Sequence, residues 1–122
     1  MTPNEYQQAV LSTAAKADMP LLLGAIGLSG EVGEVNELIK KHFWHGKLVN
    51  PHDIALELGD VCWYVAYLAN IIGTDFETIL QINVDKIKER YPDGFPNKLS
   101  ECSYINEDVS SVETHEPGHI PW

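Results

Sequence analysis

Cysteine and positive charge are both scarce in this chain of 122 residues, which has two cysteines and eight Lys plus Arg against eighteen Asp plus Glu. Two cysteines make no disulfide framework, so we expect a reducing, cytoplasmic setting. The formal net charge of -10 repels a phosphate polymer and disfavours a protein that wraps on DNA or RNA. A small anion could still bind through a local basic cluster or a metal ion.

Long uninterrupted apolar runs are also missing, and the first residues (MTPNE) have no basic segment followed by an apolar one. We therefore expect neither secretion nor insertion into a membrane. The composition is 44% hydrophobic and 21% charged, which is typical of a soluble globular protein. The length fits one domain with one hydrophobic core.

Proline is excluded from the interior of several long segments, because it is tolerated in the first turn of a helix but breaks its middle. The fold class predicted from this spacing is all-α, with four helices in a domain at residues 1–96 and an irregular tail at 97–122. The predicted helices run from Pro3 to about Ala17, from Pro20 to about His42, from Pro51 to Ile72 after an Asn50 N-cap, and from Thr74, capped reciprocally by Glu77, to about Arg90.

The third of these helices is apolar nearly all round, since Asn70 is the one strongly polar residue from Val61 to Ile72. Such a helix must be covered on several sides. We therefore predict a homodimer or homotetramer whose interface completes the bundle. The second predicted helix holds four glycines that each cost about 1 kcal/mol relative to alanine and so need a tertiary reason; they are Gly24, Gly27, Gly30 and Gly33.

Two pairs of acidic residues stand three positions apart, Glu31 with Glu34 and Glu57 with Asp60, so that each pair projects from one face of its helix. For an arbitrary helix such a face is simply solvated. Here, however, one stripe of residues spaced by three or four changes from carboxylates to aromatics, which a purely solvated face would not do. Its residues are Asp53, Glu57, Asp60, Tyr64 and Tyr67.

Four carboxylates that converge to roughly 6 Å would repel one another by about 3 kcal/mol per pair at an effective dielectric constant near 20. A cation must then lie between them. Ligand sets made of oxygen alone favour Mg²⁺, with Mn²⁺ as a substitute, and disfavour Zn²⁺.

Asn83, Lys86 and Arg90 fall at i, i+3 and i+7 on the last predicted helix, which places an amide and two cations on one face. In isolation this is an exposed basic stripe. Beside metal-bound carboxylates, the same stripe would suit a polyphosphate, because arginine bonds two oxygens at once and lysine supplies a point charge.

These segments resemble the ordered motifs of the MazG-like, all-α nucleoside triphosphate pyrophosphohydrolases, over roughly residues 20 to 96. The motifs are E-x-x-E at Glu31 and Glu34, E-x-x-D at Glu57 and Asp60, and N-x-x-K-x-x-x-R-Y-P from Asn83 to Pro92. The resemblance implies Mg²⁺-dependent cleavage of a nucleoside triphosphate, and of a deoxynucleotide in particular, between the α and β phosphates. The products would be the monophosphate and pyrophosphate.

The resemblance also implies roles for individual residues. The four acids would bind the metal, Lys86 and Arg90 would hold the phosphates, Asn83 would orient sugar or phosphate, and Tyr64 would pack against sugar or base. Glu34 is our hypothesis for the base that accepts a proton from the attacking water.

Two other interpretations stay open at this point. A di-iron bundle also uses acids on facing helices, but it normally adds Glu-x-x-His pairs, and none occurs in the second to fourth predicted helices. A non-catalytic helical oligomer could bind a nucleotide or a protein and keep the acids as a structural metal site.

Overall fold

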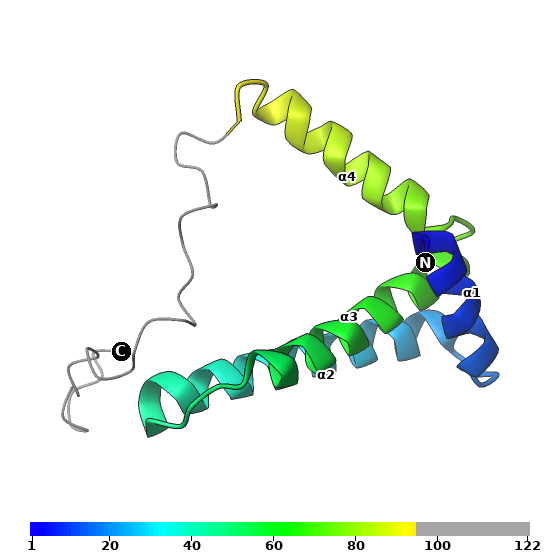
Figure 1. The fold of residues 1–122 in the computed structure, drawn as a ribbon. Helices are drawn as coiled ribbons and strands as arrows, with labels where there is room; N and C mark the ends of the chain where they lie inside the picture. The colour runs from blue at the N-terminus through cyan, green and yellow to red at the C-terminus, as the bar shows by residue number, and fades with distance from the viewer. Residues whose placement is uncertain (95–122) are drawn as a thin grey trace.

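The structure is a computed structural model that describes residues 1–94. These residues form four helices and no strand: α1 (Pro3–Thr13), α2 (Pro20–His45), α3 (Pro51–Ile71) and α4 (Phe76–Arg90) (Figure 1). The predicted all-α class is thereby confirmed. The tail predicted at residues 97–122 lies outside the described residues.

Side-chain caps explain where several helices begin. Thr2 and Glu5 form the predicted capping box of α1, and the Asn50 side chain accepts a hydrogen bond from the backbone N–H of His52 at the start of α3. The prediction of Thr74 as the cap of α4 was wrong, since α4 is capped by Asp75. The Asp75 carboxylate accepts hydrogen bonds from both the backbone N–H (2.8 Å) and the hydroxyl (3.0 Å) of Thr78, and a carboxylate is the stronger acceptor.

Two helix ends also differ from the prediction. α1 stops at Thr13 rather than near Ala17, because the backbone of Ala14 is extended. The hydroxyls of Ser12 and Thr13 donate to carbonyls one turn earlier, a competition that weakens a helix end. α2 continues to His45, one residue before Gly46, whose φ of 61° is the left-handed conformation of a C-cap.

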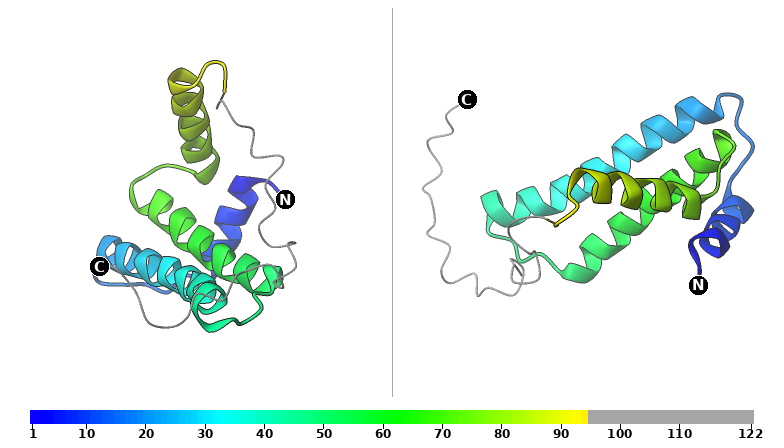
Figure 2. Two further views of the ribbon diagram at one scale, coloured as in Figure 1. Left: turned by 90° about the vertical axis from the view of Figure 1, so that its left-hand side faces the viewer. Right: turned by 90° about the horizontal axis from the view of Figure 1, so that it is seen from above.

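α2 and α3 form a long antiparallel pair that makes most of the tertiary contacts (Figures 1 and 2). Two of the four glycines of α2 explain why α2 and α3 approach each other closely. A Cβ atom added to Gly24 would meet Leu68 and Tyr67, and one added to Gly27 would overlap the ring of Tyr64. Gly24 and Gly27 therefore have the tertiary reason that the sequence predicts.

α1 crosses the pair at the end where α2 begins and α3 ends (Figure 1), and it closes a small core of Val10, Ala66, Tyr67 and Phe76. The buried Gln7 side chain lies beside this core, donates to the Ala66 carbonyl (3.1 Å) and accepts from the Phe76 backbone N–H (3.1 Å). Gln7 thus connects α1, α3 and the first residue of α4.

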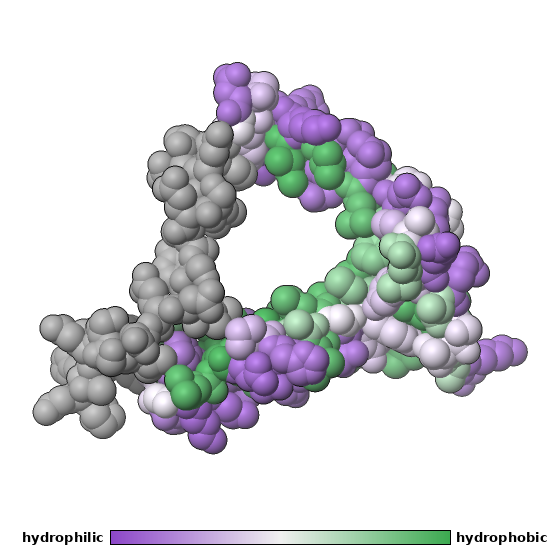
Figure 3. Space-filling view, in the orientation of Figure 1, coloured by the Kyte–Doolittle hydropathy of each residue, from purple (hydrophilic) through white to green (hydrophobic). Residues whose placement is uncertain are grey.

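α4 diverges from the α2–α3 pair (Figure 2). Within residues 1–94 it contacts α1 and α3 but not α2. Its apolar residues Leu80, Val84 and Ile87 are exposed, and Figure 3 shows hydrophobic surface both on α4 and on the pair, facing the open space between them.

Helix α3 is long and apolar enough to span a membrane, by length and composition alone. This is a weak criterion, because core helices of soluble proteins also meet it. Only 17% of the apolar 18-residue segment of α3 is buried inside the single chain.

Candidate functional site

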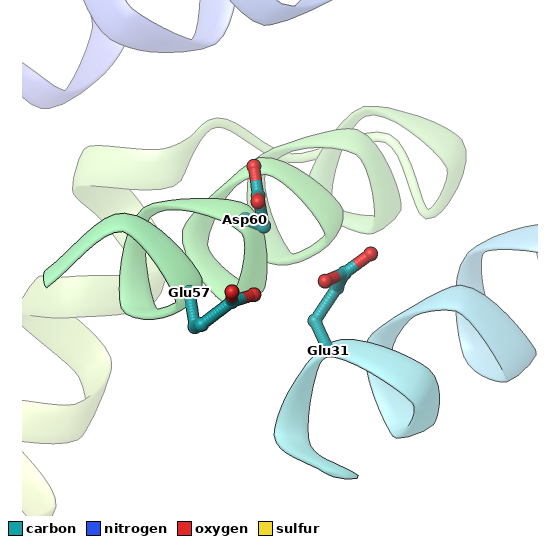
Figure 4. Close-up of side chains that lie close together, drawn as sticks. All are labelled: Glu31, Glu57 and Asp60. Carbon is teal, nitrogen blue, oxygen red and sulfur yellow. The ribbon is translucent and has the colours of Figure 1, made fainter. Parts of the chain in front are cut away.

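Three of the four predicted acids come together at the middle of the α2–α3 pair. Glu31 projects from α2, Glu57 projects from α3 toward it, and Asp60 lies beside them on the next turn of α3 (Figure 4). One carboxylate oxygen from each residue lies within 4.8 Å of the others. Glu31 and Glu57 are half-buried, whereas Asp60 is exposed. We call these three residues the acidic triad.

The register of the two helices explains this meeting. Gly27 lies one turn before Glu31 on α2 and packs against Tyr64, which lies one turn after Asp60 on α3. Equal steps in opposite directions along two antiparallel helices keep residues level, so Glu31 reaches the level of Asp60. The close contact at Gly27 therefore positions the triad.

Glu34 is exposed and is not a member of the triad. The same register continued by one turn places Glu34 level with Glu57, and its charge contributes to the electrostatics of Glu31. The structure thus brings three of the four acids within ligand distance and leaves the fourth at the edge of the group. Its role as the base stays a prediction.

The triad repels itself electrostatically. Burial raises the pKa of Glu31 above its usual value, and the charges of Asp60, Glu57 and Glu34 raise it further. In the part of the chain that the structure describes, the ion pairs join Glu37 to Lys40 and Lys41, so no lysine or arginine neutralises the triad. Three carboxylates without a cationic partner fit a hard divalent cation.

This repulsion predicts a pH-dependent stability in metal-free buffer. Because the pKa of Glu31 is higher in the folded than in the unfolded chain, ionised Glu31 destabilises the fold above both pKa values, and the effect vanishes below the unfolded value. Glu31→Gln should therefore melt at a higher temperature than wild type near pH 8. The difference should disappear near pH 4, below the usual glutamate pKa of about 4.3. Thermal melts with a chelator measure this, and an equal difference at both pH values would contradict it.

The predicted substrate residues divide into two groups. Tyr64 is half-buried against Gly27, one turn from Asp60. Asn83, Lys86 and Arg90 are all exposed on α4, which does not contact α2 within residues 1–94. Within one chain, the structure therefore brings Tyr64 to the triad but does not bring the α4 cations there.

Tyr6 approaches the triad from α1, and nothing in the sequence pattern predicts this. Its hydroxyl donates to the carbonyl of Gly59 at 3.2 Å. Burial raises the pKa of Tyr6, and electrostatic interaction with the neighbouring Cys62 and Asp60 raises it further. The sequence places Tyr6 on the apolar face of its helix, but only the crossing of α1 over α3 brings it here.

Comparison with known proteins identifies the family of this chain. Residues 23–95 match the model of a family described as the MazG nucleotide pyrophosphohydrolase domain, and this range contains the whole triad. The chain is also 40% identical over 73 residues to the Gene 37 protein of Mycobacterium phage L5. This match covers 57% of the present chain. The match spans 64% of the phage protein, just under two thirds of its length. No solved structure matches.

Proposed function

We propose that this chain hydrolyses nucleoside triphosphates between the α and β phosphates to the monophosphate and pyrophosphate, because it belongs to the MazG nucleotide pyrophosphohydrolase family. The observation that carries the proposal is the acidic triad, which gathers three carboxylates from two helices with no neutralising Lys or Arg among residues 1–94. The proposed substrates are deoxynucleotides, and the proposed location is the cytoplasm.

The donor set of the triad suits Mg²⁺, with Mn²⁺ as a substitute, because it consists of carboxylate oxygens alone. Glu31, Glu57 and Asp60 would hold the ions, with Glu34 as a further ligand. When bound, such ions neutralise phosphate charge and lower the pKa of a bound water. Glu34 would accept the proton of the attacking water, since it is exposed and level with Glu57.

The substrate would lie along the α2–α3 pair beside the triad. Tyr64 would pack against its sugar or base, because its ring is held by Gly27 one turn from Asp60. Lys86 and Arg90 would bind the phosphates, and Asn83 would orient sugar or phosphate. The net charge of -10 disfavours a nucleic-acid polymer as a partner.

A panel of ribonucleoside and deoxyribonucleoside triphosphates tests the function. With Mg²⁺ we expect stoichiometric release of pyrophosphate and monophosphate from at least one of them, and none with a chelator. Release of inorganic phosphate instead would place the cleaved bond elsewhere. Metal-dependent binding of nucleotides without turnover would favour the non-catalytic oligomer.

We further propose that the chain works as a homodimer or homotetramer in which α4 of one copy supplies the phosphate-binding cations to the triad of another. Two observations support this assembly. α4 of the same chain does not contact α2, and hydrophobic residues on α4 and on the α2–α3 pair face open space (Figure 3). Exposed apolar surfaces of this kind favour an interface between copies.

Mixing two inactive variants tests the shared site. Asp60→Asn loses a triad residue, and Arg90→Ala loses a phosphate-binding residue. If α4 serves the partner copy, each mixed dimer restores one complete site. Random reassortment into dimers should then recover about a quarter of wild-type pyrophosphate release. If α4 serves the triad of its own chain, the mixture should stay as inactive as its components.

A further inference from the structure

Helix α1 precedes the matched region of residues 23–95, yet it reaches the helix that carries two members of the triad. The Tyr6 hydroxyl donates a hydrogen bond to the Gly59 carbonyl oxygen at 3.2 Å. That oxygen belongs to the peptide group that joins Gly59 to Asp60. The hydrogen bond therefore acts on the peptide group that directly precedes the α carbon of Asp60.

The position of Asp60 depends on its backbone. Within residues 1–94, no hydrogen bond or ion pair holds the Asp60 carboxylate, and the residue is exposed. Gly59 has no side chain to pack, and a Cβ atom there would meet nothing within 4 Å in the described part of the chain. An external contact to the Gly59 carbonyl is thus a direct way to fix where Asp60 faces Glu31.

Tyr6 is itself held firmly enough to serve as an anchor. Its ring packs against the buried Phe76 with ring centroids 6.1 Å apart. The next residue, Gln7, is 3% exposed and bonds both to the Ala66 carbonyl and to the Phe76 N–H. This part of α1 is therefore fixed to α3 and to the start of α4.

We propose that Tyr6 is a positioning residue, which holds the Gly59–Asp60 peptide so that the Asp60 carboxylate stays within ligand distance of Glu31 and Glu57. The proposal rests on the proposed function in one respect, namely that the triad binds a divalent cation. Tyr6 acts through Asp60 and touches neither metal nor substrate.

The variant Tyr6→Phe tests this role, because it keeps the ring that packs on Phe76 and removes only the hydroxyl. Thr13→Val is the matched control. Thr13 also joins α1 to α3, where its hydroxyl oxygen accepts a hydrogen bond from the Trp63 indole N–H at 3.1 Å, and that bond does not involve the Asp60 peptide. Mn²⁺ is the probe, and its binding to the full chain is followed by electron paramagnetic resonance, with thermal melts alongside.

We expect both variants to melt at similarly reduced temperatures. Tyr6→Phe alone should bind Mn²⁺ more weakly, by about tenfold, which is at the lower end of the effect of losing a supporting hydrogen bond at a metal site. Wild-type affinity in Tyr6→Phe, or equal weakening in both variants, would overturn the positioning role and leave the proposed function standing. Failure of the wild-type chain to bind Mn²⁺ would overturn both.

Discussion

Asp60→Asn is expected to reduce Mg²⁺-dependent pyrophosphate release by about a thousandfold, the upper range for removing one preorganised electrostatic group from an active site. Asparagine has nearly the same shape as aspartate but no charge. The variant therefore keeps the geometry of α3 while the triad keeps only two of its three anionic ligands. The assay is pyrophosphate release from the best substrate of the nucleotide panel at saturating Mg²⁺.

Asp53→Asn is the control for this experiment. Asp53 lies on the same helix, is exposed, and is not a member of the triad. Both substitutions remove one negative charge from α3, so any general effect of net charge is shared. Because Asp53 is in the first turn of α3, its loss should cost about 0.3–1 kcal/mol of helix stability and leave turnover unchanged. Comparable activity in the two variants would disprove the assignment of the triad.

Helix starts were predictable because they depend on residues close in sequence. Thr2 with Glu5 caps α1, and Asn50 caps α3, as predicted. The start of α4 was misassigned because Thr74 and Asp75 are adjacent, and both residue types favour caps. Only the structure shows that Glu77 is occupied elsewhere, where it exchanges two hydrogen bonds with Asn4.

The meeting of the acids was predictable only in part. Spacing by three places each pair on one face of a helix, but it does not fix how far one helix slides along the other. That register depends on Gly24 and Gly27, whose missing side chains admit Leu68, Tyr67 and Tyr64 from α3. Which glycines lie in the contact cannot be read from α2 alone.

The direction of α4 was beyond prediction for a different reason. It is set by tertiary hydrogen bonds between residues about seventy positions apart, such as those of Gln7 to the Phe76 N–H and of Asn4 to Glu77. The sequence predicts only that an amide and two cations lie on one face of α4. It does not predict that these residues stand apart from the triad of their own chain.

The four glycines of α2 now separate into two classes. Gly24 and Gly27 lie against side chains of α3, whereas a Cβ atom on Gly30 or Gly33 would meet no atom of residues 1–94 within 4 Å. The expectation that all four have a tertiary reason was therefore wrong for Gly30 and Gly33 within one chain. This difference allows the same substitution to be compared at two positions of one helix.

Gly24→Val should lower the free energy of unfolding by about 3 kcal/mol, the upper range for overpacking a well-packed site. A Cβ atom at this buried position would lie 2.8 Å from the γ carbon of Leu68 and 3.2 Å from the ring of Tyr67. Tyr67 is 5% exposed and belongs to the core, so it has little room to move. In a domain of this size the melting temperature should fall by roughly 10–20 °C.

Gly30→Val is the matched control, since it adds the same side chain to the same helix where a Cβ atom has open space. It should change the free energy of unfolding by less than about 1 kcal/mol, because valine is slightly better than glycine in a helix. Thermal melts of both variants at several protein concentrations provide the comparison. If Gly24→Val were as mild as Gly30→Val is expected to be, the α2–α3 contact would not run through Gly24. The register that places Glu31 level with Asp60 would then be wrong as well.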